Sequence, residues 1–244
     1  MELTVLGGWG AFPEANDACS GYLLKSKGRN ILLDCGPGVL SSLANHIKFE
    51  ELDAVVLSHY HADHMSDIYS LQYALDIMIK IGKRKTPLYI YANNIEDKFH
   101  KLDYREACRA IPVRDGDVVD IFGISFHFFK TKHQKTCYAM RIEAEGKVIV
   151  YTADTGWIEG LIDFSVRADL LICESSLFNQ QKGLNEGHLT AGEAGKIALQ
   201  SEANLLLMTH FPHEGDLNKL REEAENEFDK DKILIARKGM CICI

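Results

Sequence analysis

The sequence predicts an α/β fold in which two mixed β-sheets pack face to face with helices on their outer faces, an αββα sandwich. Three observations lead to this expectation. Short apolar runs rich in β-branched residues recur along the whole chain, helical patterns are few, and the second half repeats the plan of the first, with strands followed by helices. No Pro-, Gly- or Ser-rich linker interrupts the chain, so we expect a single domain over residues 1–244.

Each expected strand is a short run bounded by Gly, Asp, Asn or charged residues, as strands in compact domains are. The periodicity of these runs does not fix their order within the sheets. In chain order, they lie at 3–6, 21–25, 30–34, 54–58, 88–92, 124–129, 138–142, 147–152, 170–174, 205–209 and 232–236.

Helical patterns occupy 38–48, 65–82, 190–201 and 215–228. The clearest is TAGEAGKIALQSEA (190–203), in which Thr190 and Glu193 have the spacing of a capping box. The segment 65–81 is apolar around much of its circumference. Packing on a sheet explains most of that character, and a surplus apolar face could form a homodimer interface or a wall of a substrate pocket.

Composition and charge limit the classes of partner. The chain has 244 residues and 46% hydrophobic content, which is enough for a large buried core. Its net charge of −8 repels phosphate backbones and so disfavours a broad nucleic-acid interface. A small anionic substrate could still bind, because bound cations would reverse the local field.

The seven cysteines are odd in number and contain no CxxC pair, so we interpret them as free thiols in a reducing compartment. Cys241 and Cys243 could form a weak soft-metal pair, but one face of a terminal strand is the simpler interpretation. The N-terminus MELTVLGG lacks a basic region, and no apolar run approaches the roughly 18 residues that span a bilayer. We therefore expect a cytoplasmic protein with no membrane partner.

The segment LSHYHADHMSD (57–67) directly follows an apolar strand and crowds metal-competent side chains onto one turn. His59 and His61 are two residues apart and point to the same side, and Asp63 follows at the same spacing. His64 points elsewhere, so one turn can offer ligands to two metal ions. Imidazole and carboxylate together favour a first-row divalent ion, zinc above all.

Four ligands on one turn cannot complete two coordination shells, so further ligands must come from later in the chain. Candidates at the ends of the expected strands in the second half are His133, Asp154, His188 and His210. Asp154 and His210 each directly follow a strand run, where side chains are held rigidly and remain accessible.

These motifs together resemble the metallo-β-lactamase superfamily, and more closely its ribonuclease Z branch and the related phosphodiesterases. The likeness spans nearly the whole chain in the family's order. It is carried by LGGWGAFP (6–13), ILLDCGPG (31–38), SHYHADH (58–64), YTADTG (151–156), LLICESS (170–176), GHLTAGEAGKIA (187–198) and MTHF (208–211).

The resemblance implies the metallo-β-lactamase fold and a cofactor of two divalent metal ions, most often zinc, with manganese or iron as alternatives. It also implies an assignment for each ligand. The first ion would be bound by His59, His61 and His133, the second by Asp63, His64 and His210, and both by a bridging Asp154. The lactam-hydrolysing branch has cysteine at the bridging position, so the aspartate here points to phosphoester chemistry.

The family also carries a Glu–His pair, and Glu174 and His188 match its two positions. The resemblance implies that this pair acts as the general acid that protonates the leaving oxygen. Zinc lowers the pKa of bound water to about 7, which supplies a nucleophile at neutral pH. Asp63 could orient or deprotonate that water. His188, kept charged by Glu174, could protonate the leaving group, which is worth roughly 10²–10⁴-fold in rate.

Two other segments near the motifs remain open to more than one interpretation. LGGWGAFP lacks the lysine of a phosphate-binding P-loop, so we expect a tight loop on the floor of the site. Asp34 could hold a ligand imidazole in its tautomer, or could simply begin the turn at Gly36-Pro37-Gly38.

Two departures from ribonuclease Z bear on the substrate. Only two strand runs, 138–142 and 147–152, fill the interval between His133 and Asp154, which leaves no room for a tRNA-binding arm. The sequence THFPHEGD also lacks the arginine that usually follows. We therefore disfavour tRNA and expect a small anionic phosphodiester. Another ester class (lactone, thioester or sulfate ester) on the same site, or a non-catalytic metal-binding or sensing protein, are the alternatives.

Overall fold

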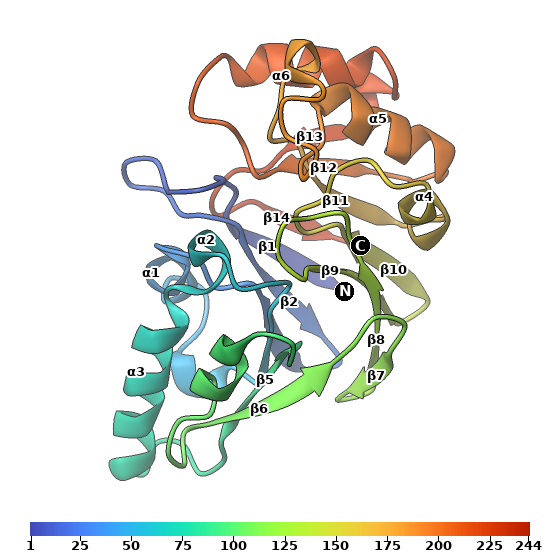
Figure 1. Cartoon of the computed structure of the whole chain (residues 1–244). Coiled ribbons are helices and arrows are strands. Elements are labelled where there is room, and N and C mark those ends of the chain that lie inside the picture. The colour runs from blue at the N-terminus through green and yellow to red at the C-terminus, as the bar shows by residue number, and fades with distance from the viewer. The chain divides into compact units, whose positions relative to one another are not determined.

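The structure is a computed structural model that describes residues 1–244. It divides into two compact units, Met1–Arg114 with Arg237–Cys243, and Asp115–Ala236 with Ile244. Each unit contains one mixed seven-stranded sheet and its helices (Figure 1). The predicted α/β class with two mixed sheets is therefore confirmed, whereas the single domain stays a prediction.

The sheet of the first unit is antiparallel on one side and parallel on the other. In sheet order the strands are β14 (Cys241–Cys243), β1 (Glu2–Gly7), β2 (Gly21–Ser26), β3 (Arg29–Leu33), β4 (Ala54–Val56), β5 (Leu88–Asn93) and β6 (Cys108–Val113). From β14 to β3 neighbouring strands are antiparallel, and from β3 to β6 they are parallel.

Strand β4 positions the histidine turn. All three of its residues are buried, because β3 and β5 flank it and its apolar side chains lie in the core. Ligand sites of parallel sheets lie at the carboxyl ends of such strands. The turn that begins at Ser58 leaves the sheet at that edge.

Five helical segments cover the first unit: α1 (Val39–Leu43), η1 (Phe49–Glu51), α2 (Ala62–Met65), α3 (Ile68–Lys80) and η2 (Asp97–Lys101). On α3 the spacing of Ile68, Leu71 and Leu75 is that of one helix face, and these three side chains are buried in the core of the unit. The helix packs there because this face is apolar.

Two of the expected helices are shorter than the sequence patterns suggested. The expected helix over 65–82 is interrupted before Ile68, because the Asp67 N–H donates to the Cys35 carbonyl and its carboxylate accepts the Leu40 N–H. The expected helix over 38–48 ends at Leu43, where the side-chain amide of Asn45 competes for the carbonyls of the last turn.

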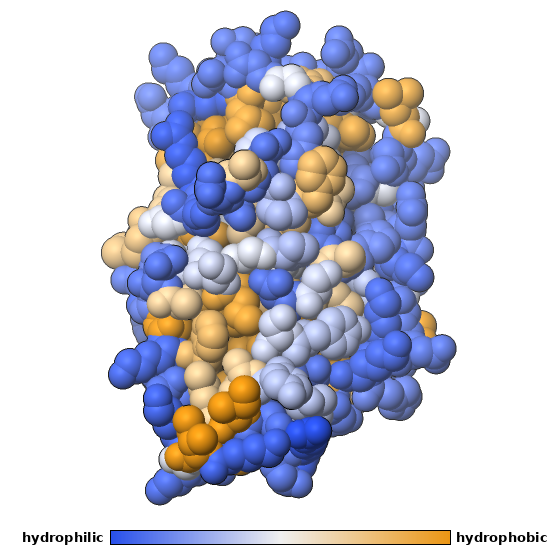
Figure 2. Space-filling view, turned by 90° about the vertical axis from the view of Figure 1, so that its left-hand side faces the viewer, coloured by the Kyte–Doolittle hydropathy of each residue, from blue (hydrophilic) through white to orange (hydrophobic).

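The outer face of α3 is apolar. Tyr69, Tyr73, Ile77 and Ile81 recur at every fourth residue and are 45–60% exposed. The only acidic residue of this helix, Asp76, is buried and pairs with Lys80 and Arg105. Figure 2 looks onto the side where α3 lies and shows apolar atoms gathered on the lower part of that face. The surplus apolar surface is therefore present, and its use as a homodimer interface stays a prediction.

The sheet of the second unit repeats the mixed plan. Strands β7 to β10 form an antiparallel meander, and β10 to β13 are parallel. In sheet order the strands are β13 (Ile233–Ile235), β12 (Leu206–Thr209), β11 (Leu170–Glu174), β10 (Lys147–Tyr151), β9 (Tyr138–Ala144), β8 (Ile124–Lys130) and β7 (Val118–Ile121).

The helical segments of the second unit are α4 (Gly160–Phe164), η3 (Asn179–Gln181), α5 (Ala191–Gln200), α6 (Leu217–Glu225) and η4 (Lys230–Lys232). The late helices α5 and α6 confirm the two expected at 190–201 and 215–228. No helix of the chain combines the length and the apolar character that crossing a lipid bilayer requires.

Two strands and one α-helix were not predicted from the sequence. Strand β6 contains Pro112, which cannot donate to a sheet ladder and argues against a strand, but β6 is an edge strand where proline is tolerated. Strand β7 is also an edge strand and has little buried surface to create a pattern. Helix α4 has five residues, which is too short to show a helical period.

The predicted capping box at α5 is confirmed. The Thr190 hydroxyl accepts the Glu193 N–H at 3.2 Å, and the Glu193 carboxylate accepts the Thr190 N–H at 3.0 Å. We expect Thr190→Ala to lower the free energy of unfolding by about 1 kcal/mol, because an N-terminal donor of the helix loses its acceptor. Urea unfolding measures this. Thr190→Ser, which keeps the hydroxyl, should stay close to the parent, and an equal loss in both variants would contradict the explanation.

All seven cysteines are free, as predicted. Burial, with Asp63 nearby, raises the pKa of the Cys19 thiol to about 12, and burial raises that of Cys108 to about 12. These two thiols stay protonated at neutral pH. Cys241 and Cys243 are exposed on the terminal strand β14. This agrees with the simpler interpretation, in which they lie on one face of a terminal strand.

Candidate metal centre

A buried carboxylate organises the histidine turn of the first unit. Asp34, which is fully buried at the end of β3, accepts the N–H and the hydroxyl of Ser58, both at 2.7 Å. It also accepts Nδ1–H of His64 at 2.8 Å. Of the two interpretations left open for Asp34, the structure shows the first, in which this side chain holds an imidazole of the turn.

The ring nitrogens and the carboxylate oxygen of the predicted ligands on the turn lie close to one another. Nε2 of His59 lies 3.0 Å from Nδ1 of His61, and Nε2 of His64 lies 3.4 Å from Oδ2 of Asp63. His59 and His64 are fully buried, and their ring centroids are 4.2 Å apart. Three imidazoles and one carboxylate thus lie together, as the spacing predicted.

The glycine-rich loop lies against this turn within the first unit. The Ala11 N–H donates to Oδ2 of Asp63 at 2.9 Å, and Ala11 takes a left-handed conformation with φ 59° to do so. This agrees with the expected loop on the floor of the site. The contact fixes the orientation of the Asp63 carboxylate.

Gly36 packs directly against the backbone of the turn. A Cβ at this position would lie 1.7 Å from the carbonyl oxygen of Asp63, which no side chain can occupy without moving the turn. We expect Gly36→Ala to displace Asp63 and His64 and to reduce bound metal, measured by elemental analysis of purified protein. Gly28→Ala is the control for folding yield, because no atom lies within 4 Å of its Cβ position, although φ 70° there also carries strain. Full metal content in Gly36→Ala would contradict the argument.

In the second unit, Asp154 lies between two histidines. Its Oδ2 is 3.7 Å from Nε2 of His133, and its Oδ1 is 3.3 Å from Nε2 of His210. Asp154 follows β10 and His210 follows β12, so both stand at the carboxyl edge of the parallel part of the sheet. Each oxygen of one carboxylate therefore faces a different imidazole.

Glu174, at the end of β11, is almost fully buried and holds His188. Its Oε1 accepts Nδ1–H of His188 at 3.0 Å and the Thr155 N–H at 2.7 Å. Its Oε2 accepts the Leu189 N–H at 3.1 Å and the Ser176 hydroxyl at 2.7 Å. The His188 ring stacks on His210 with centroids 5.4 Å apart. The predicted Glu–His pair is thus formed beside a predicted ligand.

The residues fit divalent metal ions. Nδ1 of His59, His64, His133 and His210 meets Ser58, Asp34, the Gly187 carbonyl and Ser176 respectively. Those contacts leave the Nε2 lone pairs as ligands. Two ligands on one tetrahedral zinc, each about 2.0–2.1 Å from it, are about 3.4 Å apart. The separations of 3.3–3.7 Å at Asp63 and Asp154 are of that size.

The structure therefore brings the predicted site residues together in two groups, each within its own unit. The first contains His59, His61, Asp63 and His64, and the second contains His133, Asp154, Glu174, His188 and His210. Ser58 and Ser176 were not predicted from the sequence, because serine is common in loops. The available signal was their position, one residue before His59 and two after Glu174.

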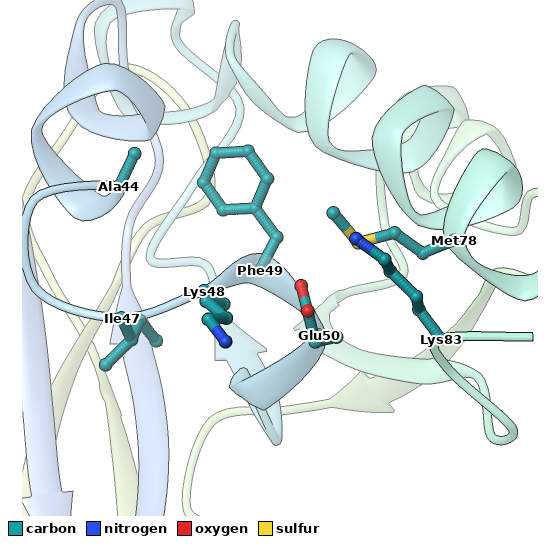
Figure 3. A pocket seen from close by; sticks show the side chains of 7 residues that line it. All are labelled: Ala44, Ile47, Lys48, Phe49, Glu50, Met78 and Lys83. Carbon is teal, nitrogen blue, oxygen red and sulfur yellow. The ribbon is translucent and has the colours of Figure 1, made fainter.

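A pocket of about 300 Å³ in the first unit lacks a cluster of metal-binding side chains. Figure 3 shows Met78 reaching from α3 towards Phe49, with charged side chains around them. The pocket contains no histidine and only one carboxylate, so we assign no catalytic role to it. Its lining residues are Ala44, Ile47, Lys48, Phe49, Glu50, Met78 and Lys83.

Comparison with known proteins agrees with these features. The family model described as the beta-lactamase superfamily domain matches residues 29–211. The protein named "Probable metallo-hydrolase YhfI" of Bacillus subtilis is 42% identical over 98% of each chain. The crystal structure of YhfI, described as a metallo-beta-lactamase fold protein, matches with a TM-score of 0.96 over 99% of this chain and 98% of that chain.

Two more distant relatives were also found. Ribonuclease Z of Methanopyrus kandleri is 25% identical over 99% of this chain and 97% of its own length. A crystal structure described as a new diphosphatase from the PhnP family has a TM-score of 0.78 at 20% identity, covering 100% of this chain and 97% of that chain. At that identity, the second likeness concerns the fold alone.

Proposed function

The chain belongs to the β-lactamase superfamily, and from that membership we propose that it is a dinuclear metal-dependent hydrolase of small phosphodiesters. The chain is a metallo-hydrolase with the metallo-β-lactamase fold. The pair of metal ions, their identity as zinc and the phosphodiester substrate are the proposal. The observation that carries it is the position of Asp154, whose two oxygens face His133 and His210 separately.

A carboxylate in that position suits a bridge between two ions. We propose that Asp154 would hold both ions and that the two groups of ligands would together complete both shells. The first ion would take His59, His61 and His133, and the second would take Asp63, His64 and His210. Imidazole and carboxylate donors without thiolate favour zinc, with manganese or iron as alternatives.

Bound divalent ions would activate water and neutralise the charge of a phosphoryl group. Side chains of this protein would transfer the protons. Asp63, oriented by the Ala11 N–H, accepts a proton from the attacking water. His188, oriented by Glu174, gives a proton to the leaving oxygen. A protein that only binds metal has no need of this proton donor, so we disfavour a sensing role.

Two features support the proposed substrate class: the aspartate at position 154 and the short segment between His133 and Asp154. The proposed bridging position holds Asp154, where the lactam-hydrolysing branch has cysteine, and one relative is named ribonuclease Z. Between His133 and Asp154 the chain forms only β9 and β10, joined at Glu145-Gly146. With no arm there and a net charge of −8, pre-tRNA is disfavoured and a small anionic substrate is proposed. Free thiols throughout fit a cytoplasmic location.

Metal removal and a substrate panel test the proposal. We expect protein stripped with a chelator to lose cleavage of bis(p-nitrophenyl) phosphate, and zinc, manganese or iron(II) to restore it. At constant metal loading, a lactone, a thioester and a sulfate ester should be cleaved more slowly than the phosphodiester. Faster turnover of one of those esters would replace the substrate class, and cleavage that survives complete metal removal would overturn the mechanism.

A further inference from the structure

One serine in each unit makes the same pair of contacts. In the second unit, the Ser176 hydroxyl lies 2.7 Å from Oε2 of Glu174 and 2.7 Å from Nδ1 of His210. In the first unit, the Ser58 hydroxyl lies 2.7 Å from Oδ2 of Asp34 and 3.0 Å from Nδ1 of His59. In both places a serine connects a buried carboxylate to an imidazole.

The direction of these hydrogen bonds follows from the available protons. A carboxylate can only accept, so the single hydroxyl proton of Ser176 goes to Glu174. The oxygen of Ser176 then presents a lone pair to His210, which must carry its proton on Nδ1. The lone pair of His210 is left on Nε2, on the side of Asp154. The hydroxyl therefore selects the tautomer that can bind a metal ion.

Each carboxylate also holds a second histidine directly. Glu174 accepts Nδ1–H of His188 at 3.0 Å, and Asp34 accepts Nδ1–H of His64 at 2.8 Å. In the second unit one buried carboxylate thus orients the predicted proton donor directly and a predicted ligand through Ser176. Ser176 is also 3.3 Å from Nδ1 of His188, so it touches both rings.

We propose that Ser176 is a positioning residue that ties the metal ligand His210 and the proton donor His188 to the single carboxylate of Glu174. Ser58 has the matching role for His59 and His64 on Asp34. The inference rests on the proposed function in that it takes His210 as a ligand and His188 as an acid. Its consequence is that removal of one hydroxyl weakens metal binding and disturbs the proton donor together.

A different explanation of the same cluster is a third metal ion. Ring nitrogens of His188 and His210 and an oxygen of Glu174 lie within 4.8 Å of one another. However, Oε1 of Glu174 already accepts two hydrogen bonds and Oε2 accepts three. An ion there would have to displace them, so the hydrogen-bonded arrangement explains the cluster better.

The test compares Ser176→Ala with Ser176→Thr, which keeps a hydroxyl, and with Ser175→Ala as the matched control. Ser175 is a buried neighbour whose hydroxyl reaches only the Cys173 carbonyl, at 3.4 Å. Zinc affinity is measured by competition with a chromophoric chelator, without substrate. We expect Ser176→Ala to bind zinc about 10–100-fold more weakly, and the other two variants to stay close to the parent.

Two further readouts separate positioning from a merely structural effect. The visible absorption of Co²⁺-loaded protein should change in Ser176→Ala and not in Ser175→Ala, because only the first alters the orientation of a ligand. Thermal unfolding of the metal-free proteins should be alike in the two variants. Unchanged zinc affinity in Ser176→Ala, an equal loss in Ser175→Ala, or three zinc ions per chain in the parent would each overturn the proposal.

The zinc measurement does not depend on the choice of substrate. If the parent binds two ions but cleaves no phosphodiester, the proposed substrate fails while the role of Ser176 is still decided by zinc affinity. If the parent cleaves phosphodiesters and Ser176→Ala keeps full zinc affinity, only the role of Ser176 fails. Ser58→Ala and Ser58→Thr repeat the comparison in the first unit, with a loss expected in the alanine variant alone.

Discussion

His64→Ala is expected to lose cleavage of bis(p-nitrophenyl) phosphate by about 10³-fold or more and to hold less than the full complement of metal. His64 is fully buried, with Nδ1 on Asp34 and Nε2 beside Asp63, so its removal takes away a proposed ligand that is held in place by a buried carboxylate. Loss of an ion that stabilises transition-state charge costs several kcal/mol, and each 1.36 kcal/mol is about tenfold in rate. Steady-state kinetics and elemental analysis of the same preparation measure both effects.

His127→Ala is the matched control, because His127 is a partly exposed histidine on β8 whose ring contacts Ser125 and Glu143. It should keep both the metal and the activity. His64→Ala protein that is folded, carries two ions and turns over at the rate of the parent would remove His64 from the site.

His188→Ala is expected to lower kcat by about 10²–10⁴-fold for a phosphodiester with an alkyl leaving group and to retain both metal ions. Glu174 accepts a hydrogen bond from Nδ1 of His188, which fixes the orientation of the ring that we propose as the proton donor. The loss should be much smaller for bis(p-nitrophenyl) phosphate, because nitrophenolate leaves readily without a proton. The ratio of the two losses therefore measures acid catalysis.

The same ratio distinguishes a proton donor from a structural residue. A His188→Ala variant that loses equal factors on both substrates, or that loses metal, would show that the ring supports the site and donates no proton. Phe12→Ala provides a comparison, since Phe12 is an exposed residue of the glycine-rich loop and carries no proton. It should affect the two substrates equally, if at all.

The histidine turn was predictable because the types and the spacing of its residues already indicate metal binding. Strand β4 is recognisable by its apolar run, and the alternation of His59, His61 and Asp63 follows directly from it. Asp154 and His210 were recognisable for a related reason, because each follows a buried strand, whereas Glu174 was implied by the family resemblance alone. Strand ends and residue types are both local properties, so they can be read from the sequence.

What the sequence could not show depends on contacts between distant residues. The break before Ile68 arises from the hydrogen bonds of Asp67 to Cys35 and Leu40, which no helical period reveals. Strand β6 is tolerated despite Pro112 only because it lies at a sheet edge. The role of Ser176 requires knowing that His210 lies beside it, although these residues are far apart in the chain.

The proposed function depends most on whether the two groups of side chains bind the same pair of metal ions. A crystal structure of the zinc-loaded protein, with anomalous data collected at the zinc edge, measures this directly. We expect two peaks about 3.5–4 Å apart, one bound by His59, His61 and His133, the other by Asp63, His64 and His210, with Asp154 between them. A single peak, or two peaks that His133, Asp154 and His210 do not contact, would contradict the account.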